Sequence, residues 1–225
     1  MMTIMDAIQA RHSVRGYQAI DIPVDALSRL RAEVEACNRE GGLHIQLITK
    51  EPKAFSGYMA HYGKFSGVQY YIALIGKKSD DLEIKLGYHG ERLAILAQRL
   101  GLNTCWVAMT FSKGATRKSC TLSRGERLVA VLALGYGVNQ GTPHKSKPMD
   151  ALCSVTAEMP EWFRRGMESA CLAPTAMNQQ KFKISFDGRA VCAQSLGGFY
   201  TKVDLGIVKY HFEAGAGQDN FIWQS

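Results

Sequence analysis

The sequence predicts an α+β fold in which helices pack around a sheet. Two stretches, 68–75 and 128–134, are apolar throughout, which is typical of strands buried on both faces. The stretch 81–100 carries Leu and Ala at helical spacing and stops at a glycine, which indicates a long amphipathic helix. Asp187-Gly188 lies between two short apolar runs and predicts a β-hairpin.

The remaining elements follow from the same two periodicities. We expect further helices at 3–10, 24–38, 160–172 and 203–214. We expect further strands at 43–49, 181–187 and 190–194, a short strand or turn at 103–109, and loops at 51–67 and 138–148. Thr3, with Asp6 three residues later, is typical of a capped helix start. The C-terminal tail ends in Phe221, Ile222 and Trp223, and three large apolar residues suggest that it packs down.

Length and composition suit one globular domain spanning 1–225. The chain is 46% hydrophobic and 21% charged, an ordinary balance. Its apolar runs are shorter than the roughly 18 residues that span a bilayer, and the first 15 residues lack the apolar core of a signal peptide. We therefore expect a cytoplasmic protein without a membrane segment.

Charge and cysteine content narrow the function classes. The formal net charge is +7, but the basic residues are scattered and no stripe interleaves them with aromatic residues, so the case for nucleic-acid binding is weak. A basic surface can also favour small anionic ligands. The six cysteines form no Cys-x-x-Cys pair and no zinc spacing, so we expect reduced thiols and no metal site.

The stretch Arg11-His12-Ser13-Val14-Arg15 is the first candidate site. In an extended segment, residues two apart point to the same side, so two guanidinium groups and a hydroxyl would face one spot. Guanidinium binds phosphate bidentately and serine adds a donor, which indicates a phosphate receptor. The alternative is a basic helix end, because cations are favourable at a helix C-terminus.

The segment from Ile8 to Tyr17 resembles the N-terminal signature of the nitroreductase-like FMN-dependent oxidoreductases, an Arg-x-Ser-x-Arg pattern after a short helix. In that family these residues hold the FMN phosphate. The resemblance therefore implies that Arg11, His12, Ser13 and Arg15 bind the cofactor.

A second signature lies in 173–180, Ala-Pro-Thr-Ala-Met-Asn-Gln-Gln. A helix ending near Ala173 would offer backbone groups, and amide side chains, which both donate and accept, suit the pyrimidine edge of flavin. The alternative is a polar helix-to-strand turn. The stretch resembles the family's Pro-Ser-x-x-Asn-x-Gln-Pro motif, which implies cofactor contacts from Thr175, Ala176, Asn178 and Gln180. Lys181 stands where the family usually has proline.

Two further stretches resemble the family. Leu-Gly-Leu-Asn-Thr-Cys-Trp at 100–106 is similar to the exit of its central helix, which implies that backbone amides of Val107, Ala108 and Met109 face flavin N5 and C4=O. Fixed N–H donors there would stabilise charge on a reduced ring. The side chains of Trp106 and Met109 are expected in the core. The stretch 126–137 is similar to the family's Leu-Gly-Tyr strand, and implies that Lys145 and Lys147 join the phosphate site; a charged loop is the alternative for both lysines.

The order of these motifs departs from common members, in which the Pro-Ser-x-x-Asn motif precedes the central helix. One branch of the family fuses two related halves in one chain, and a faint repeat here, with halves roughly 1–150 and 151–225, resembles that branch. The resemblance implies a nitroreductase-like fold, a central, mostly antiparallel sheet flanked by helices, in a monomer or homodimer.

The function implied by the resemblance is that of an FMN-dependent oxidoreductase. Bound FMN would take a hydride at N5 from NAD(P)H, a transient donor, and pass two electrons to a nitroaromatic, a quinone or a similar small oxidant. No side chain is assigned as catalytic acid or base, and His12, His61 and His211 are candidates only by type. Tyr58, Tyr62 and Phe65 could line the substrate face.

Two alternatives stay open. One is a flavoprotein of the same fold with different chemistry, either flavin destruction or reductive dehalogenation, which product analysis would separate from simple reduction. The other is a non-enzymatic module that binds a nucleotide or nucleic acid through the +7 charge. Salt-sensitive binding to DNA or RNA without any flavin would favour the second alternative.

Overall fold

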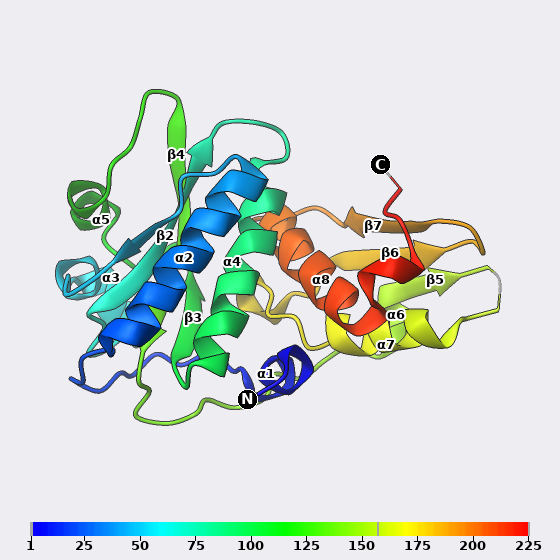
Figure 1. Cartoon of the computed structure of the whole chain (residues 1–225), viewed down its shortest axis with the longest axis horizontal. Coiled ribbons are helices and arrows are strands. Elements are labelled where there is room, and N and C mark those ends of the chain that lie inside the picture. The colour runs from blue at the N-terminus through cyan, green and yellow to red at the C-terminus, as the bar shows by residue number, and fades with distance from the viewer. Residues whose placement is uncertain (1, 157, 225) are drawn as a thin grey trace. The chain divides into compact units, whose positions relative to one another are not determined.

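Figure 1 shows the computed structural model of the chain, which describes residues 2–156 and 158–224. Residues 1, 157 and 225 fall within the expected domain 1–225 but lie outside the described residues. The described chain divides into two compact units. The first unit comprises Ala10–Leu82 and Leu93–Pro143, and the second comprises Met2–Gln9, Glu83–Arg92 and the residues from His144 onward.

The elements of the first unit are α2 (Val24–Gly41), β1 (Gln46–Ile48), η1 (Lys53–Phe55), α3 (Tyr58–Tyr62), β2 (Tyr70–Lys77), β3 (Asn103–Val107), α5 (Lys113–Ser119) and β4 (Glu126–Gly135). Those of the second are α1 (Ile4–Ala10), α6 (Met149–Leu152), β5 (Cys153–Val155), α7 (Glu161–Ala170), η2 (Ala176–Asn178), β6 (Phe182–Phe186), β7 (Val191–Ser195), α8 (Thr201–Ala216) and η3 (Gln218–Asn220). Helix α4 (Leu82–Arg99) contributes residues to both units.

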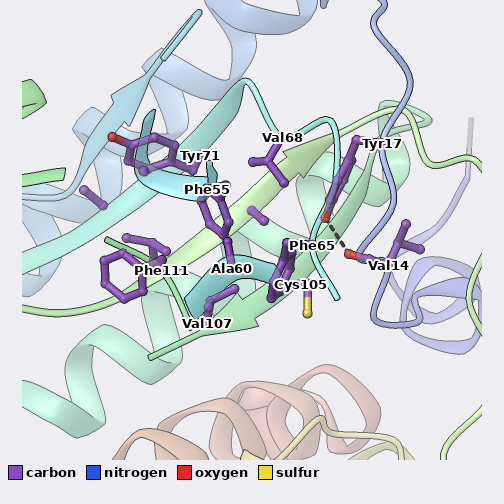
Figure 2. Close-up of a cluster of buried hydrophobic side chains, with 14 of the residues drawn as sticks. Val14, Tyr17, Phe55, Ala60, Phe65, Val68, Tyr71, Cys105, Val107 and Phe111 are labelled. Carbon is purple, nitrogen blue, oxygen red and sulfur yellow. Dashed lines mark hydrogen bonds between the residues drawn. The ribbon is translucent and has the colours of Figure 1, made fainter. Parts of the chain in front are cut away.

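The first unit is built on an antiparallel sheet of order β1-β2-β4-β3. Strands β2 and β4 are buried along nearly their whole length, as their unbroken apolar sequences predict. On one face Leu30 of α2 packs with Tyr70 and Leu134. On the other face Tyr71 and Cys105 belong to a second apolar cluster, shown in Figure 2.

The first strand is shorter than the expected 43–49. It covers only Gln46–Ile48, although the N–H of His44 also reaches β2 and donates to the carbonyl of Ile75 at 2.9 Å. Ile45, which lies between them, is bonded through its backbone to a side chain of α2. Its N–H donates to Asn38 Oδ1 at 2.7 Å, and its carbonyl accepts from Asn38 Nδ2 at 2.9 Å. A side-chain contact of this kind leaves no trace in apolar periodicity.

The expectation of an irregular loop at 51–67 is wrong in part, because η1 and α3 lie within it. Glu51 initiates η1: its carboxylate accepts the N–H groups of Lys53 at 2.9 Å and Ala54 at 3.2 Å. The short helix α5 was also not expected. Ser112 caps it by accepting the N–H of Ala115 at 3.2 Å, and its basic, glycine-containing sequence has little apolar periodicity.

The second unit contains a three-stranded sheet of order β5-β6-β7. Strands β6 and β7 form the antiparallel hairpin predicted from Asp187-Gly188, and the short β5 pairs parallel to β6. Helix α8 packs against α7 and this sheet. Gly206 of α8 allows close helix packing, because a Cβ there would collide with the carbonyl oxygen of Ile84.

Both ends of the described second unit are tied down. The predicted cap of α1 is confirmed: Thr3 N–H donates to Asp6 Oδ2 at 3.0 Å, and Asp6 N–H donates to Thr3 Oγ1 at 3.1 Å. In the tail, the ring of Phe221 stacks on Trp162 at 5.6 Å between centroids, as the apolar ending predicts. Ile222 departs from that expectation, since it is 85% exposed. No described helix combines the length and apolar character needed to cross a membrane.

Candidate functional site

The phosphate-receptor candidate, 11–15, runs extended beside β3 in the first unit. Val14 N–H donates to the carbonyl of Thr104 at 3.1 Å, and Ser13 forms a parallel bridge with Thr104. Tyr17 fixes the far end of the segment, because its hydroxyl donates to the Val14 carbonyl at 2.7 Å (Figure 2). The extended conformation expected from the sequence is therefore present.

The three polar side chains of this segment differ in burial. Arg11 is buried, at 3% exposed, whereas Ser13 and Arg15 are exposed. Burial raises the pKa of the Cys105 thiol, and Arg15, the Ser13 hydroxyl and Arg11 oppose that rise. All three side chains therefore lie near this thiol, which is itself part of the apolar core of the first unit.

His12 lies against a turn. A Cβ placed on Gly141 would lie 2.8 Å from the Cβ of His12 and 2.9 Å from the carbonyl oxygen of Ser13. Gly141 also has a φ of +72°, which favours glycine. Any side chain at 141 would therefore disturb the phosphate-receptor segment.

The predicted flavin-facing backbone follows β3 in the same unit. Val107 is the last residue of the strand, where it pairs with Val131, and the chain bends at Ala108 and Met109. The expectation that Met109 packs in the core is wrong, since 61% of it is exposed. Because of this bend, the Met109 side chain does not follow the alternation of buried and exposed side chains along β3.

Of the three expected substrate-lining aromatics, two are accessible. Tyr58 and Tyr62 on α3 are 83% and 74% exposed. Phe65 does not share this position: it is a core residue, packed against Phe55 with ring centroids 5.2 Å apart (Figure 2). It packs inward because the chain leaves α3 and turns into the apolar cluster.

The second signature forms a turn in the second unit. Helix α7 ends at Ala170, earlier than the expected end near Ala173. Thr175 Oγ1 accepts the N–H of Gln180 at 3.0 Å, and Asn178 Nδ2 donates to the carbonyl of Lys145 at 2.9 Å. The expected hydroxyl and amides therefore cluster, and they also hold the turn itself.

Gln180 and Lys147 are joined tightly. Gln180 is only 3% exposed; its Oε1 accepts the N–H of Lys147 at 2.7 Å, and its Nε2 donates to the carbonyl of Lys145 at 3.0 Å. The ammonium of Lys147 donates to the carbonyls of Gln179 and Gln180 at 3.0 and 3.2 Å. The predicted basic pair and the predicted amide turn thus form one polar cluster.

Asp204, on the first turn of α8, belongs to the same cluster, although the sequence pattern did not predict it. Its Oδ1 accepts the N–H of Ala176 at 2.9 Å, and its Oδ2 accepts from Gln179 Nε2 at 2.8 Å. Burial raises the pKa of Asp204 to about 6, against the lowering effect of these two hydrogen bonds. The only sequence signal is an acidic residue in an otherwise apolar stretch of the helix, Val-Asp-Leu-Gly-Ile-Val.

His211 has a partner on another helix. Its Nε2 lies 3.0 Å from Glu91 Oε1, and its Nδ1 lies 3.1 Å from the carbonyl oxygen of Ser169. Both side chains are 0% exposed. This pair lies in the interior of the second unit. His211 is therefore a structural residue and is no longer a candidate for a catalytic acid or base.

Among the residues that the structure describes, no three His, Cys, Asp or Glu side chains form a group that could hold a metal ion. The six cysteines are free thiols. The predicted site residues thus form two groups, one around Cys105 in the first unit and one around Asp204 and Gln180 in the second.

The chain matches known proteins along nearly its whole length. The family model described as "Putative TM nitroreductase" matches residues 3–216. A Thermotoga maritima structure titled "putative nitroreductase" is 24% identical, with a TM-score of 0.63, over 97% of this chain and 85% of that one. No curated protein matches.

Two smaller structures share the fold. One from Exiguobacterium sibiricum, solved in complex with FMN, is 14% identical with a TM-score of 0.54, over 67% of this chain and 96% of that one. One from Bacteroides thetaiotaomicron, titled "Putative NADH dehydrogenase/NAD(P)H nitroreductase", is 18% identical with a TM-score of 0.52, over 66% and 95%. The predicted α+β nitroreductase-like fold is confirmed. With a family match over residues 3–216, the chain belongs to the TM nitroreductase family.

Proposed function

We propose that this chain is an FMN-dependent oxidoreductase that moves two electrons from NAD(P)H to a nitroaromatic, a quinone or a similar small oxidant. The family match over residues 3–216 is the observation that carries the proposal. Two neighbours of the same fold add support, one solved with FMN and one titled as an NAD(P)H nitroreductase.

The donors of the first unit fit the phosphate end of FMN. Arg11, Ser13 and Arg15 bring two permanent positive charges and a hydroxyl to the surroundings of Cys105. Guanidinium groups form short, charge-assisted hydrogen bonds with phosphate, about twice as strong as neutral ones. The bridge between Ser13 and Thr104 holds the backbone of this segment on β3.

When bound, FMN supplies the two-electron chemistry, and the protein supplies orientation and charge. The backbone N–H groups of Val107, Ala108 and Met109 would face the ring, where fixed donors stabilise negative charge without reorganising. Tyr58 and Tyr62, exposed on α3, would contact the oxidant.

In the second unit, considered by itself, Asn178 is the proposed contact to a flavin ring or ribityl chain, with Thr175 and Ala176 beside it. Lys145 is an exposed cation and is proposed as a further contact to the cofactor. The side chains of Asn178, Gln180 and Lys147 also make hydrogen bonds within the turn, and these bonds hold it in place.

Replacing Arg11 with alanine is expected to weaken FMN binding ten- to a hundredfold, because a charge-assisted hydrogen bond contributes roughly 1.5–3 kcal/mol. FMN fluorescence titration of the folded variant measures the change. Arg15→Ala removes an exposed donor of the same group and is expected to act in the same direction.

Arg29→Ala on α2 is the control, since it also removes one exposed positive charge. It should leave FMN affinity within about twofold of wild type. Unchanged affinity in both folded variants, Arg11→Ala and Arg15→Ala, would remove this segment from the site.

A further inference from the structure

The turn of the second unit contains an unusual run of backbone conformations. Met177, Asn178 and Gln180 have φ values of +50°, +53° and +47°. The left-handed region costs a residue other than glycine roughly 1–2 kcal/mol. Met177 is also 86% exposed, so burial of its side chain does not compensate for that cost. Such a conformation persists only where neighbouring groups impose it.

Asp204, on α8, holds one side of the turn in this conformation. One carboxylate oxygen accepts the N–H of Ala176, at the start of the left-handed run, and the other accepts the side-chain amide of Gln179 within it. The same Gln179 amide also donates to the carbonyl of Phe199 at 3.1 Å, in the loop before α8. Asp204 therefore spans the turn with two hydrogen bonds from one rigid helix.

The placement of Asp204 is itself fixed. It is 3% exposed, and its N–H donates to the carbonyl of Tyr200 at 2.9 Å in the first turn of α8. Tyr200 is left-handed as well, with a φ of +58°. A carboxylate is buried only at considerable cost unless it is bonded, so its position opposite two donors of one turn is a specific arrangement.

The other side of the turn is held separately. Gln180 and Lys147 join it to the segment before α6, and Thr175 Oγ1 accepts the Gln180 N–H. Asn178 is held from this side as well, because its Nδ2 donates to the carbonyl of Lys145 and its Oδ1 accepts from Gln180 Nε2, each at 2.9 Å. None of these contacts reaches the N–H of Ala176, so loss of the Asp204 carboxylate releases the start of the turn, from which the left-handed run begins at Met177.

We infer that Asp204 is a positioning residue, which holds the 175–180 turn in the left-handed conformation that presents Asn178 to FMN. This inference rests on the proposed function for its ligand. It assigns the residue no contact with the cofactor, because the carboxylate is occupied by Ala176 and Gln179.

The first test uses the ligand-free protein. In Asp204→Asn, the NH₂ of the new amide faces either Ala176 N–H or Gln179 Nε2. Both of these groups are donors, so one of the two hydrogen bonds is lost. Hydrogen exchange of the peptide covering 174–181 should accelerate at least tenfold, since the N–H groups of Ala176, Asn178, Gln179 and Gln180 are all bonded in the turn. Asp187→Asn is the matched control, because Asp187 also accepts two backbone N–H groups, in the β6–β7 hairpin. Its effect should stay within that hairpin.

The second test measures FMN affinity of the same variants by fluorescence titration. Asp204→Asn should bind FMN about tenfold more weakly than wild type, and Asp187→Asn should match wild type. Adding Gln179→Glu to Asp204→Asn supplies an acceptor for the new amide but removes the bond from residue 179 to the Phe199 carbonyl, so it should restore part of the lost affinity and part of the lost exchange protection. A residue needed only for its volume would not be rescued by this second change.

The outcomes separate the inference from the function on which it rests. Absence of FMN binding by the wild type would overturn both, whatever the exchange shows. Wild-type binding of FMN, with an Asp204→Asn variant that exchanges faster but binds equally well, would overturn the inference and leave the function standing. Unchanged exchange in a folded Asp204→Asn variant would overturn it as well.

Discussion

Glu91→Ala is expected to destabilise the protein by about 3–5 kcal/mol, the usual cost of removing one partner of a buried ion pair. Glu91 and His211 are both 0% exposed and 3.0 Å apart. Without the carboxylate, the Nε2 atom of a fully buried imidazole loses this partner. The free energy of unfolding from urea denaturation measures the loss.

The hydrogen bonds of His211 support this magnitude. A carbonyl oxygen can only accept, so Nδ1 must donate to Ser169, 3.1 Å away. Nε2 then either donates to the ionised Glu91 carboxylate or accepts a hydrogen bond from the O–H of a neutral Glu91. In both cases the pair shares one proton and links three helices, α4, α7 and α8.

The double variant Glu91→Leu with His211→Leu provides the control for this prediction. Replacing a whole buried ion pair with apolar residues of similar size is often neutral. We therefore expect the double variant to be more stable than Glu91→Ala alone. A loss of less than 1 kcal/mol in Glu91→Ala would contradict the account of the pair.

Asp204 is expected to make the protein less stable as the pH rises from about 4 to 7. Its pKa is raised from 3.8 to about 6 in the folded protein, because burial disfavours the charge. The folded state therefore holds more protons than the unfolded state between these values, and the free energy of unfolding falls as pH increases. At about 1.4 kcal/mol per pH unit, the full effect is at most roughly 3 kcal/mol.

Urea denaturation of wild type and Asp204→Asn at several pH values isolates this effect. The free energy of unfolding of Asp204→Asn minus that of wild type should increase from pH 4 to pH 6.5 and then stay constant, because only the wild type loses stability through this carboxyl group. Asp187→Asn is the control. Hydrogen bonds from Ala190 and Arg189 lower the pKa of Asp187, so this carboxylate stabilises the folded state more as the pH rises, which is the opposite dependence. A pH-independent difference for Asp204→Asn would contradict the assigned ionisation.

Elements with a strong single periodicity could be predicted from the sequence. The buried strands β2 and β4, the long helix α4 and the hairpin at Asp187-Gly188 are all present within a few residues of their expected bounds. Elements defined by one side-chain contact could not be predicted. Asn38 holds the backbone of Ile45 just before β1, Glu51 starts η1 and Ser112 caps α5, and none of these contacts changes the apolar pattern.

The residues of the candidate site also differ in whether the sequence alone could predict them. The alternation of Arg11, Ser13 and Arg15 predicted an extended segment of donors, because that pattern is local in sequence. Asp204 lies 28 residues from Ala176, and only the fold brings the two together. The burial of Phe65 and the exposure of Met109 likewise depend on bends that follow α3 and β3.

The visible absorption spectrum of the purified protein, before and after incubation with FMN and desalting, tests the proposed function most directly. The account predicts a retained flavin spectrum that bleaches when NAD(P)H is added without oxygen and returns when a quinone or nitroaromatic follows. A protein that retains no flavin after this treatment would contradict it.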